Sequence, residues 1–308
     1  AALRADALYT GLREEPPDSD EVDAVVDAFM DAANEVFPGV CVHFEDWKGD
    51  DAIRLLARYR DRYLVYNDDI QGTASVALAG LLTALQIKGE ALADQRILFA
   101  GAGSAGIGIA GMIVTAMREA GASEDEARSR ITLFDVNGLI ETSRTDLNPS
   151  QAPYARDAEP TRDLAEAVRR IRPTVLVGVS TVGGLFTEAV VKAMAEACDR
   201  PVIFPLSNPT DKAECTPEQA YGWTDGRALV ACGVQFPDVV RDGRTFHPGQ
   251  ANNFYIFPAL ALAVYATRPE RIDDAMFIEA ARATADQVSH AERGEGMLYP
   301  RQDNILET

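Results

Sequence analysis

Hydrophobic positions along the chain change their period many times, from short continuous apolar runs to spacings of three and four residues. The short runs predict buried strands, at residues 96–100, 131–134, 173–179, 201–206 and 228–232. Helical spacing follows most of them and predicts helices at residues 101–117, 162–171, 187–198 and 217–221. Strands that alternate with helices predict a parallel sheet covered on both faces, which is a Rossmann-type, doubly wound α/β fold.

The pattern before this alternation is different. Residues 21–37 predict a helix with one apolar face, on which Val22, Val25, Phe29, Ala33 and Val36 recur at spacings of three and four. A strand (39–46), a short helix (52–60) and a second strand (63–66) follow, and together they predict a strand–helix–strand unit.

A long apolar helix over residues 73–87 separates this unit from the alternating region, and the chain ends in helices predicted at 254–267 and 272–289. The chain is therefore expected to divide into three parts. These are the remnant of a substrate and metal domain (1–70), a Rossmann domain (71–253) and C-terminal helices that pack back on the first part (254–308).

Composition narrows the class of protein. The chain of 308 residues has 48 acidic and 29 basic side chains, a net charge of −19. Such a surface repels phosphate backbones and anionic lipid, which argues against nucleic-acid and peripheral-membrane partners. No apolar run approaches the roughly 20 residues that span a bilayer.

The four cysteines are scattered, without a CxxC pair, so neither a zinc knuckle nor a disulfide framework is expected. This indicates a reducing compartment. We expect a cytoplasmic protein, with the mitochondrial matrix as the alternative.

A glycine-rich hexapeptide directly follows the strand predicted at 96–100 and opens an apolar helix. It fits G-x-G-x-x-G and consists of Gly101, Ala102, Gly103, Ser104, Ala105 and Gly106. In this context the first glycine makes a tight turn, the second lets the backbone approach a pyrophosphate, and the third allows close packing. Small residues also serve other tight strand-to-helix turns, so the loop alone leaves both interpretations open.

Asp135 ends the next predicted strand, as expected for a carboxylate that binds the adenosine ribose. The separation between Gly106 and Asp135 exceeds the usual distance of about 20 residues, because the acidic segment 123–130 lies between them. Val136, Asn137 and Gly138 follow it, so no arginine stands immediately beside it to favour a 2′-phosphate. The expected cofactor is therefore NAD, with NADP as the alternative.

Two pairs of acids end the two strands of the N-terminal unit: Glu45 and Asp46, and Asp68 and Asp69. A parallel sheet could bring the pairs side by side, and Mg²⁺ or Mn²⁺ would accept three such carboxylates. A metal held there could polarise a carbonyl and stabilise an enolate. The alternative is four solvated acids in an acidic chain.

Amides also stand at predicted ligand-binding positions: Asn208 follows a strand, while Asn252 and Asn253 begin a helix. An amide can orient a dicarboxylate without adding charge, although Asn-Pro turns and asparagine N-caps are equally ordinary explanations. His43 is interpreted as a core or boundary residue rather than as a base.

Six segments occur in the same order as in the malic enzymes of the large, eukaryote-like subfamily, which the chain closely resembles. They are residues 44–47, 66–82, 101–110, 204–216, 248–262 and 296–300. The resemblance implies a decarboxylating malate dehydrogenase, which converts (S)-malate to pyruvate and CO₂ with NAD or NADP and a divalent metal. It also implies a homo-oligomer, a dimer or tetramer, for the complete enzyme.

The resemblance assigns roles to individual residues. Glu45, Asp46 and Asp69 match the metal ligands, and Asp68 matches the aspartate that supports the catalytic lysine. The dinucleotide positions correspond to Gly101, Gly103, Gly106 and Asp135, and the malate contacts to Asn208, Asn252 and Asn253. Gln151 falls where NADP-preferring members tend to carry lysine, which again favours NAD.

The ends of the chain depart from the family pattern. Residues 7–13 resemble a segment just after the family's N-terminal catalytic region, and the chain stops soon after residues 298–300. The general-base lysine, the general-acid tyrosine and a substrate arginine are therefore expected to be missing. Two alternatives stay open: a malolactic enzyme that releases lactate, and a catalytically silent NAD-binding module.

Overall fold

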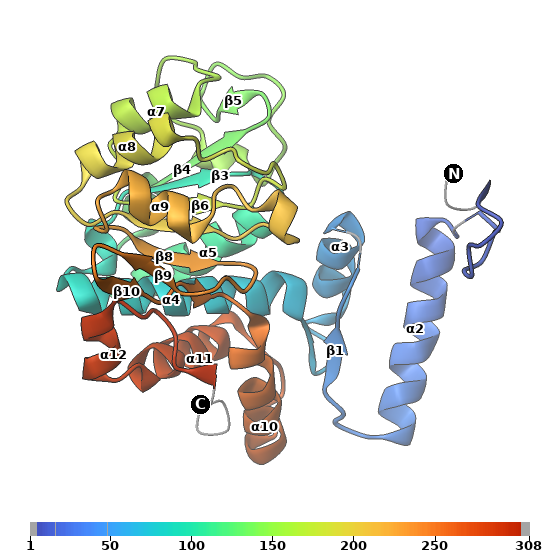
Figure 1. The fold of residues 1–308 in the computed structure, drawn as a ribbon. Coiled ribbons are helices and arrows are strands. Elements are labelled where there is room, and N and C mark those ends of the chain that lie inside the picture. The colour runs from blue at the N-terminus through green and yellow to red at the C-terminus, as the bar shows by residue number, and fades with distance from the viewer. Residues whose placement is uncertain (1–4, 16, 48, 303–308) are drawn as a thin grey trace.

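The computed structural model describes residues 5–15, 17–47 and 49–302, and its main body is built on one seven-stranded sheet (Figure 1). The spatial order is β11, β8, β7, β6, β3, β4, β5, and all neighbours are parallel except β4 and β5. The strands are β3 (Ile97–Ala100), β4 (Ile131–Asp135), β5 (Gly138–Leu139), β6 (Val175–Gly178), β7 (Val202–Pro205), β8 (Leu229–Cys232) and β11 (Gly249–Gln250).

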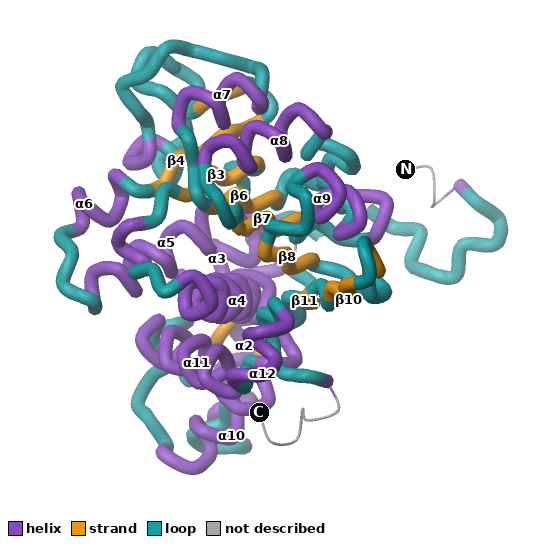
Figure 2. The backbone as a smooth tube through the Cα atoms, turned by 60° about the vertical axis from the view of Figure 1, so that its left-hand side comes forward, coloured by secondary structure: helices purple, strands orange, loops and turns teal. Residues whose placement is uncertain are grey.

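Helices cover both faces of the sheet (Figures 1 and 2). One face carries α4 (Thr73–Lys88), α5 (Ser104–Glu119) and α11 (Asp274–Gln287), and the other carries α7 (Leu164–Ile171), α8 (Glu188–Ala197) and α9 (Pro217–Trp223). Alternate residues of β3 enter the two cores: Ile97 and Phe99 pack on one side, Leu98 and Ala100 on the other. This is the predicted doubly wound α/β fold, and that prediction is confirmed.

The order of connections reverses between β3 and β6. From β3 the chain passes through α5 to β4 on one side, and from β6 it passes through α8 and α9 to β7 and β8 on the other. In open α/β sheets a crevice forms at this point, outside the carboxyl ends of the strands. Gly101 and Val179 follow directly after β3 and β6 and line it.

The N-terminal unit has its own small sheet, in which β1 (Val42–Phe44) pairs in parallel with β2 (Val65–Asn67). Helix α3 (Gly49–Tyr59) joins the two strands, and α2 (Ser19–Val36) packs on the outer side of this unit (Figure 1). Phe44 is opposite Asn67 in the register, so the acids that follow each strand come out at the same edge. The predicted strand–helix–strand unit is therefore present.

Helix α2 corrects one expectation about burial. Val25, Phe29 and Val36 of the predicted apolar face are 70%, 55% and 65% exposed, whereas Val26 and Met30 are buried against α3 and β1. The periodicity identified the helix, but the side that is buried is set by packing against the rest of the unit.

The central helix α4 continues from a π-helical turn, Asp68–Gly72. By length and composition this 21-residue segment could cross a membrane, contrary to the expectation from the apolar runs alone. Most of it is buried inside the protein, against α5 and α11, so the structure uses it as a core helix.

Several short elements were not predicted. They are α6 (Glu124–Ser129), β5, the hairpin of β9 (Val239–Arg241) and β10 (Arg244–Phe246), β11, and α12 (His290–Glu295). Each is only two to six residues long, too short to show a period. Helix α10 (Phe257–Thr267) begins later than predicted, and the three-part division of the chain stays a prediction.

Candidate active site

The carboxylates predicted to bind a metal come together at the edge of the small sheet. One ligand oxygen from each of Glu45, Asp46 and Asp69 lies within 4.8 Å of the others. In the described chain no arginine or lysine is paired with Asp46, Asp68 or Asp69, so their mutual repulsion has no counter-charge from those side chains. A hard divalent cation is the group that oxygen ligands at this spacing fit.

The backbone of the first acidic pair is held in an unusual conformation at Asp46. Asp46 has a φ of +57°, a region that few residues other than glycine adopt. Its amide donates a 2.8 Å hydrogen bond to Asp69 Oδ2, which ties the two strand ends together. Burial and the charge of Glu45 raise the pKa of Asp69. Backbone strain of this kind is characteristic of sites where geometry serves function.

Asp68 lies deeper than the other three acids. It is 2% exposed, its Oδ1 has no hydrogen-bond partner among the described residues, and Oδ2 accepts a 2.9 Å bond from Asn253 Nδ2. Burial raises its pKa to about 6. A Cβ on Gly72 would come within 2.0 Å of Asp68 Oδ1, so a glycine is required to leave room for this carboxylate.

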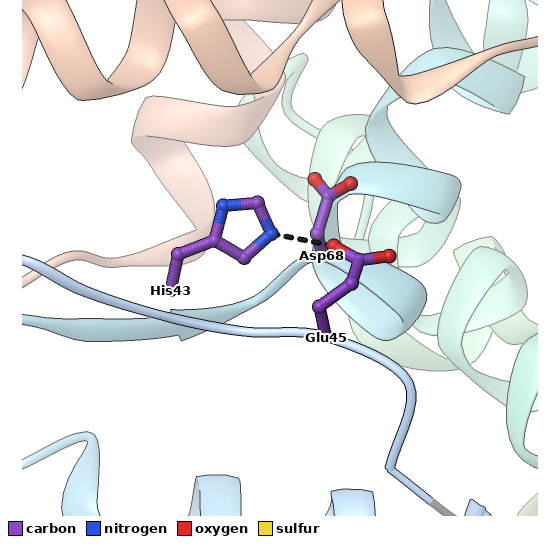
Figure 3. A group of neighbouring side chains, drawn as sticks. All are labelled: His43, Glu45 and Asp68. Carbon is purple, nitrogen blue, oxygen red and sulfur yellow. Dashed lines mark hydrogen bonds and ion pairs between the residues drawn. The ribbon is translucent and has the colours of Figure 1, made fainter. Parts of the chain in front are cut away.

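His43 contacts the acidic cluster, so its interpretation as a core or boundary residue is incomplete. Its Nε2 lies 2.6 Å from Glu45 Oε2, and its Nδ1 lies 3.0 Å from the hydroxyl of Tyr66. Figure 3 shows His43, Glu45 and Asp68 converging from strand β1 and the start of the π-helical turn. The ring can therefore orient Glu45, as the outer partners of metal ligands do.

A cavity of about 530 Å³ contains all four acids and reaches the carboxyl ends of β7 and β8. Asn208, Asn252 and Asn253 also line it, as predicted for substrate contacts. Their amides are not equally free. That of Asn253 bonds to Asp68 and Thr73, and the carbonyl of Asn252 caps the following turn.

The glycine loop occupies the crevice at the end of β3. Gly101 has a φ of +120°, and a Cβ there would lie 2.5 Å from Val179 O. A Cβ on Gly106 would lie 2.2 Å from Gly101 O. At Gly103, by contrast, φ is negative and a Cβ would meet no protein atom. The absence of a side chain there is explained by close approach of a ligand, as a pyrophosphate requires.

Asp135 ends β4 as predicted, but Arg144 forms a two-pronged ion pair with it, at 2.8 Å for both contacts. Arg144 also binds Asp146 at 2.8 Å and lowers the pKa of that carboxyl to about 2. The expectation of no arginine beside Asp135 considered only its sequence neighbours. The tight β4–β5 hairpin brings Arg144 back, and its Asn137-Gly138 pair is the signal that would have indicated it.

A second residue missed by sequence reasoning is Glu214, which is fully buried between the loops after β6 and β7. It accepts hydrogen bonds from the amides and the hydroxyls of Ser180 and Ser207. Ser207 precedes Asn208, so Glu214 holds the loop that places this amide in the cavity. Its sequence neighbours Ala213 and Cys215 are small, apolar and buried, which is the one local signal that this carboxylate could be buried too.

The class of protein follows from this arrangement: a doubly wound α/β protein with a dinucleotide-type glycine loop and a carboxylate cluster beside the same crevice. Comparison with known sequences refines it. Residues 70–308 match the family model described as "Malic enzyme, NAD binding domain", and residues 1–60 match "Malic enzyme, N-terminal domain". The chain belongs to the malic enzyme family.

Individual relatives agree with this assignment. The chain is 47% identical to the NADP-dependent malic enzyme of Mus musculus over 98% of its own length and 53% of the relative's. It is 43% identical to the mitochondrial NAD-dependent malic enzyme of Ascaris suum, over 99% of this chain and 48% of the relative. The chain thus spans about half the length of the curated relatives it matches.

Solved structures show the same fold. The malic enzyme of Entamoeba histolytica superimposes with a TM-score of 0.71 at 28% identity, over 92% of this chain and 54% of that one. The malic enzyme of Pyrococcus horikoshii gives a TM-score of 0.68 at 25% identity, over 94% of this chain and 61% of that one.

Proposed function

We propose that this chain carries the metal and cofactor sites of an enzyme that converts (S)-malate to pyruvate and CO₂ while reducing NAD(P). The observation that carries the proposal is one cavity, lined by Glu45, Asp46 and Asp69 and by the amides of Asn208 and Asn252. Its floor is the π-helical turn that contacts α5, the helix that begins at the glycine loop. The metal site, the site for the dicarboxylate substrate and the site for the nicotinamide would then lie next to one another.

Each group has a separate task in this proposal. Glu45, Asp46 and Asp69 would hold Mg²⁺ or Mn²⁺, which supplies Lewis acidity toward the oxygen atoms of the substrate. Asn208 and Asn252 would orient the malate carboxylates by hydrogen bonding without adding charge. The glycine loop would fix the cofactor so that its nicotinamide accepts the hydride from C2.

Asp68 would support proton transfer. Its pKa of about 6 allows it to hold or release a proton near neutral pH, and Asn253 fixes the orientation of its carboxylate. Among the described residues the lining of this cavity includes neither lysine nor tyrosine, so we assign the main base and acid to no described side chain.

We also propose NAD as the preferred cofactor. Arg144, which contacts the carboxylate expected to bind the ribose, is shared between Asp135 and Asp146, so its charge is already balanced. Gln151 donates a 3.1 Å hydrogen bond to Ala102 O in the glycine loop and brings no positive charge. Both observations favour the free ribose hydroxyls of NAD over the 2′-phosphate of NADP. The homo-oligomeric state and the cytoplasmic location stay predictions.

Because no described side chain is assigned as the main base or acid, the test is to supply the N-terminal catalytic region of a malic enzyme as a separate polypeptide, incubate both with malate, Mn²⁺ and either NAD or NADP, and measure NAD(P)H, pyruvate, CO₂ and lactate. The proposal predicts NAD(P)H, pyruvate and CO₂ in equal amounts, with a higher kcat/KM for NAD than for NADP. Asp69→Asn should abolish turnover, whereas Asp211→Asn, on the surface after β7, should leave it unchanged.

Two results would contradict the proposal. Lactate without net NADH would indicate a malolactic reaction. Tight binding of NAD and Mn²⁺ without any product would indicate a silent binding module.

A further inference from the structure

A second cavity lies at the opposite end of the sheet from the candidate active site. It has a volume of about 540 Å³ and is lined by the segments that precede β7 and β8, by the end of α4 and by α12. The crevice for the cofactor is at the carboxyl ends of the strands, whereas this cavity is at their amino ends. It is therefore separate from every site described above.

Four arginines line this cavity: Arg200, Arg227, Arg244 and Arg293. Three of them are held by contacts that leave their charge in place. Arg227 donates to the carbonyls of residues 195, 199 and 224, Arg244 lies over the Phe246 ring, and Arg293 donates to the Gln86 side chain. Among the described residues, only Arg227 of the four has a carboxylate within ion-pair distance, that of Asp199.

Carboxylate partners are scarce around these arginines. Among the described residues, Arg200, Arg244 and Arg293 form no ion pair, and a buried Nε of Arg293 has no hydrogen-bond partner. Two carboxylates, Asp199 and Asp225, also line the cavity. Asp199 lies 3.6 Å from Arg227 and its side chain is 94% exposed, and Asp225 lies 3.9 Å from Arg241, which is not among the lining residues. Elsewhere in this acidic chain arginines do find acids, as Arg144 does.

Four arginines against two aspartates leave an excess of positive charge in the cavity, which favours an anionic ligand. A guanidinium group can donate two parallel hydrogen bonds to the oxygens of one phosphate. A di- or triphosphate places several negative charges in a small volume and can therefore bind several arginines at once. The volume falls within the roughly 300–1,000 Å³ usual for small-molecule sites. Nucleic acid would require an open basic stripe rather than a cavity in a chain of net charge −19.

We propose that this cavity binds a small molecule that carries a di- or triphosphate group. The probe is inorganic pyrophosphate, titrated by calorimetry into the protein at constant ionic strength with saturating NAD, so that the glycine loop is occupied. The expected result is one pyrophosphate bound per chain. Citrate, a carboxylate probe of similar charge, should bind at least tenfold more weakly.

Arg200→Gln and Arg293→Gln are each expected to weaken pyrophosphate binding about tenfold, because each removes a charged hydrogen-bond donor. Arg118→Gln is the matched control: Arg118 is 53% exposed at the end of α5, away from the cavity, and its loss should change nothing. If Arg293→Gln fails to fold, Arg200→Gln and Arg244→Gln carry the test, since neither side chain makes an ion pair in the described structure.

Four results would overturn the proposal. These are no binding above the matched salt control, complete displacement of pyrophosphate by NAD, equal affinity in the variants and in Arg118→Gln, and citrate affinity that equals or exceeds that of pyrophosphate.

Discussion

Replacing Glu214 tests how the loops of the candidate site are held. This buried carboxylate receives hydrogen bonds of 2.6 and 2.8 Å from the hydroxyls of Ser207 and Ser180, and of 3.3 and 2.9 Å from their amides. Gly178 has no side chain because a Cβ there would lie 2.5 Å from the Glu214 carboxyl carbon. The loops after β6 and β7 are therefore joined through this one group.

The size of the effect follows from those contacts. Glu214→Ala leaves two buried amide donors without a hydrogen-bond acceptor, which costs about 1–3 kcal/mol for each donor, and it also leaves a cavity. We therefore expect a loss of about 3–5 kcal/mol in the free energy of unfolding. Glu214→Gln keeps three of the four bonds in weaker, neutral form and removes a buried charge. Its net cost should be only about 1–2 kcal/mol.

The assay is urea unfolding of the wild type and both variants, with Glu188→Gln on the exposed side of α8 as the control. Because Ser207 leads into Asn208, Glu214→Gln should also raise KM for malate more than it lowers kcat. A loss below about 1 kcal/mol for Glu214→Ala would refute the argument, since the buried amides would then have other partners.

Three further changes have distinct expected outcomes. Gly103→Ala should weaken NAD binding at least tenfold in a fluorescence titration and lower the free energy of unfolding by no more than about 1 kcal/mol. Gly101→Ala should lower the free energy of unfolding by about 3 kcal/mol, because its added Cβ is strained and overlaps the neighbouring backbone. Equal stability losses in the two variants would contradict the different roles given to these glycines. His43→Phe should weaken Mn²⁺ binding about tenfold in calorimetry, as loss of a residue that orients a ligand does, and unchanged affinity would show that the ring has no such role. Hydrogen bonds from Arg58 and Tyr59 hold the folded-state pKa of Asp27 at about 2, below its unfolded value. Asp27→Asn should therefore be less stable than the wild type near neutral pH, and this difference should disappear as the pH falls from about 4 to 2. A difference in urea unfolding that does not change with pH would rule this out.

The sequence alone could predict that the four acids gather at one edge, because this depends on local order; that they bind a metal stays a prediction. Two hydrophobic strands that each end in acids must place those acids together once the strands pair in parallel, and the register of Phe44 against Asn67 does this. The glycine loop is similarly local: Gly101, Gly103 and Gly106 follow one strand and begin one helix. The alternation of strands and helices predicted the doubly wound sheet for the same reason.

Contacts between distant segments could not be predicted in this way. Arg144 reaches Asp135 through a hairpin too short to show a period, and Asn253 joins Asp68 across 185 residues of sequence. Glu214 is polar in the sequence but fully buried in the fold, because two loops supply its partners. In each case a side chain's partner depends on packing between elements, which the period of a single element does not encode.

The most direct test of the account is a Mn²⁺ titration followed by electron paramagnetic resonance, on the wild type, Asp69→Asn and Asp211→Asn. The account predicts one bound Mn²⁺ per chain in the wild type and in Asp211→Asn, with affinity reduced at least 100-fold in Asp69→Asn because a charged ligand is lost. Equal Mn²⁺ affinity in all three proteins would contradict the assignment of Glu45, Asp46 and Asp69 as the metal site.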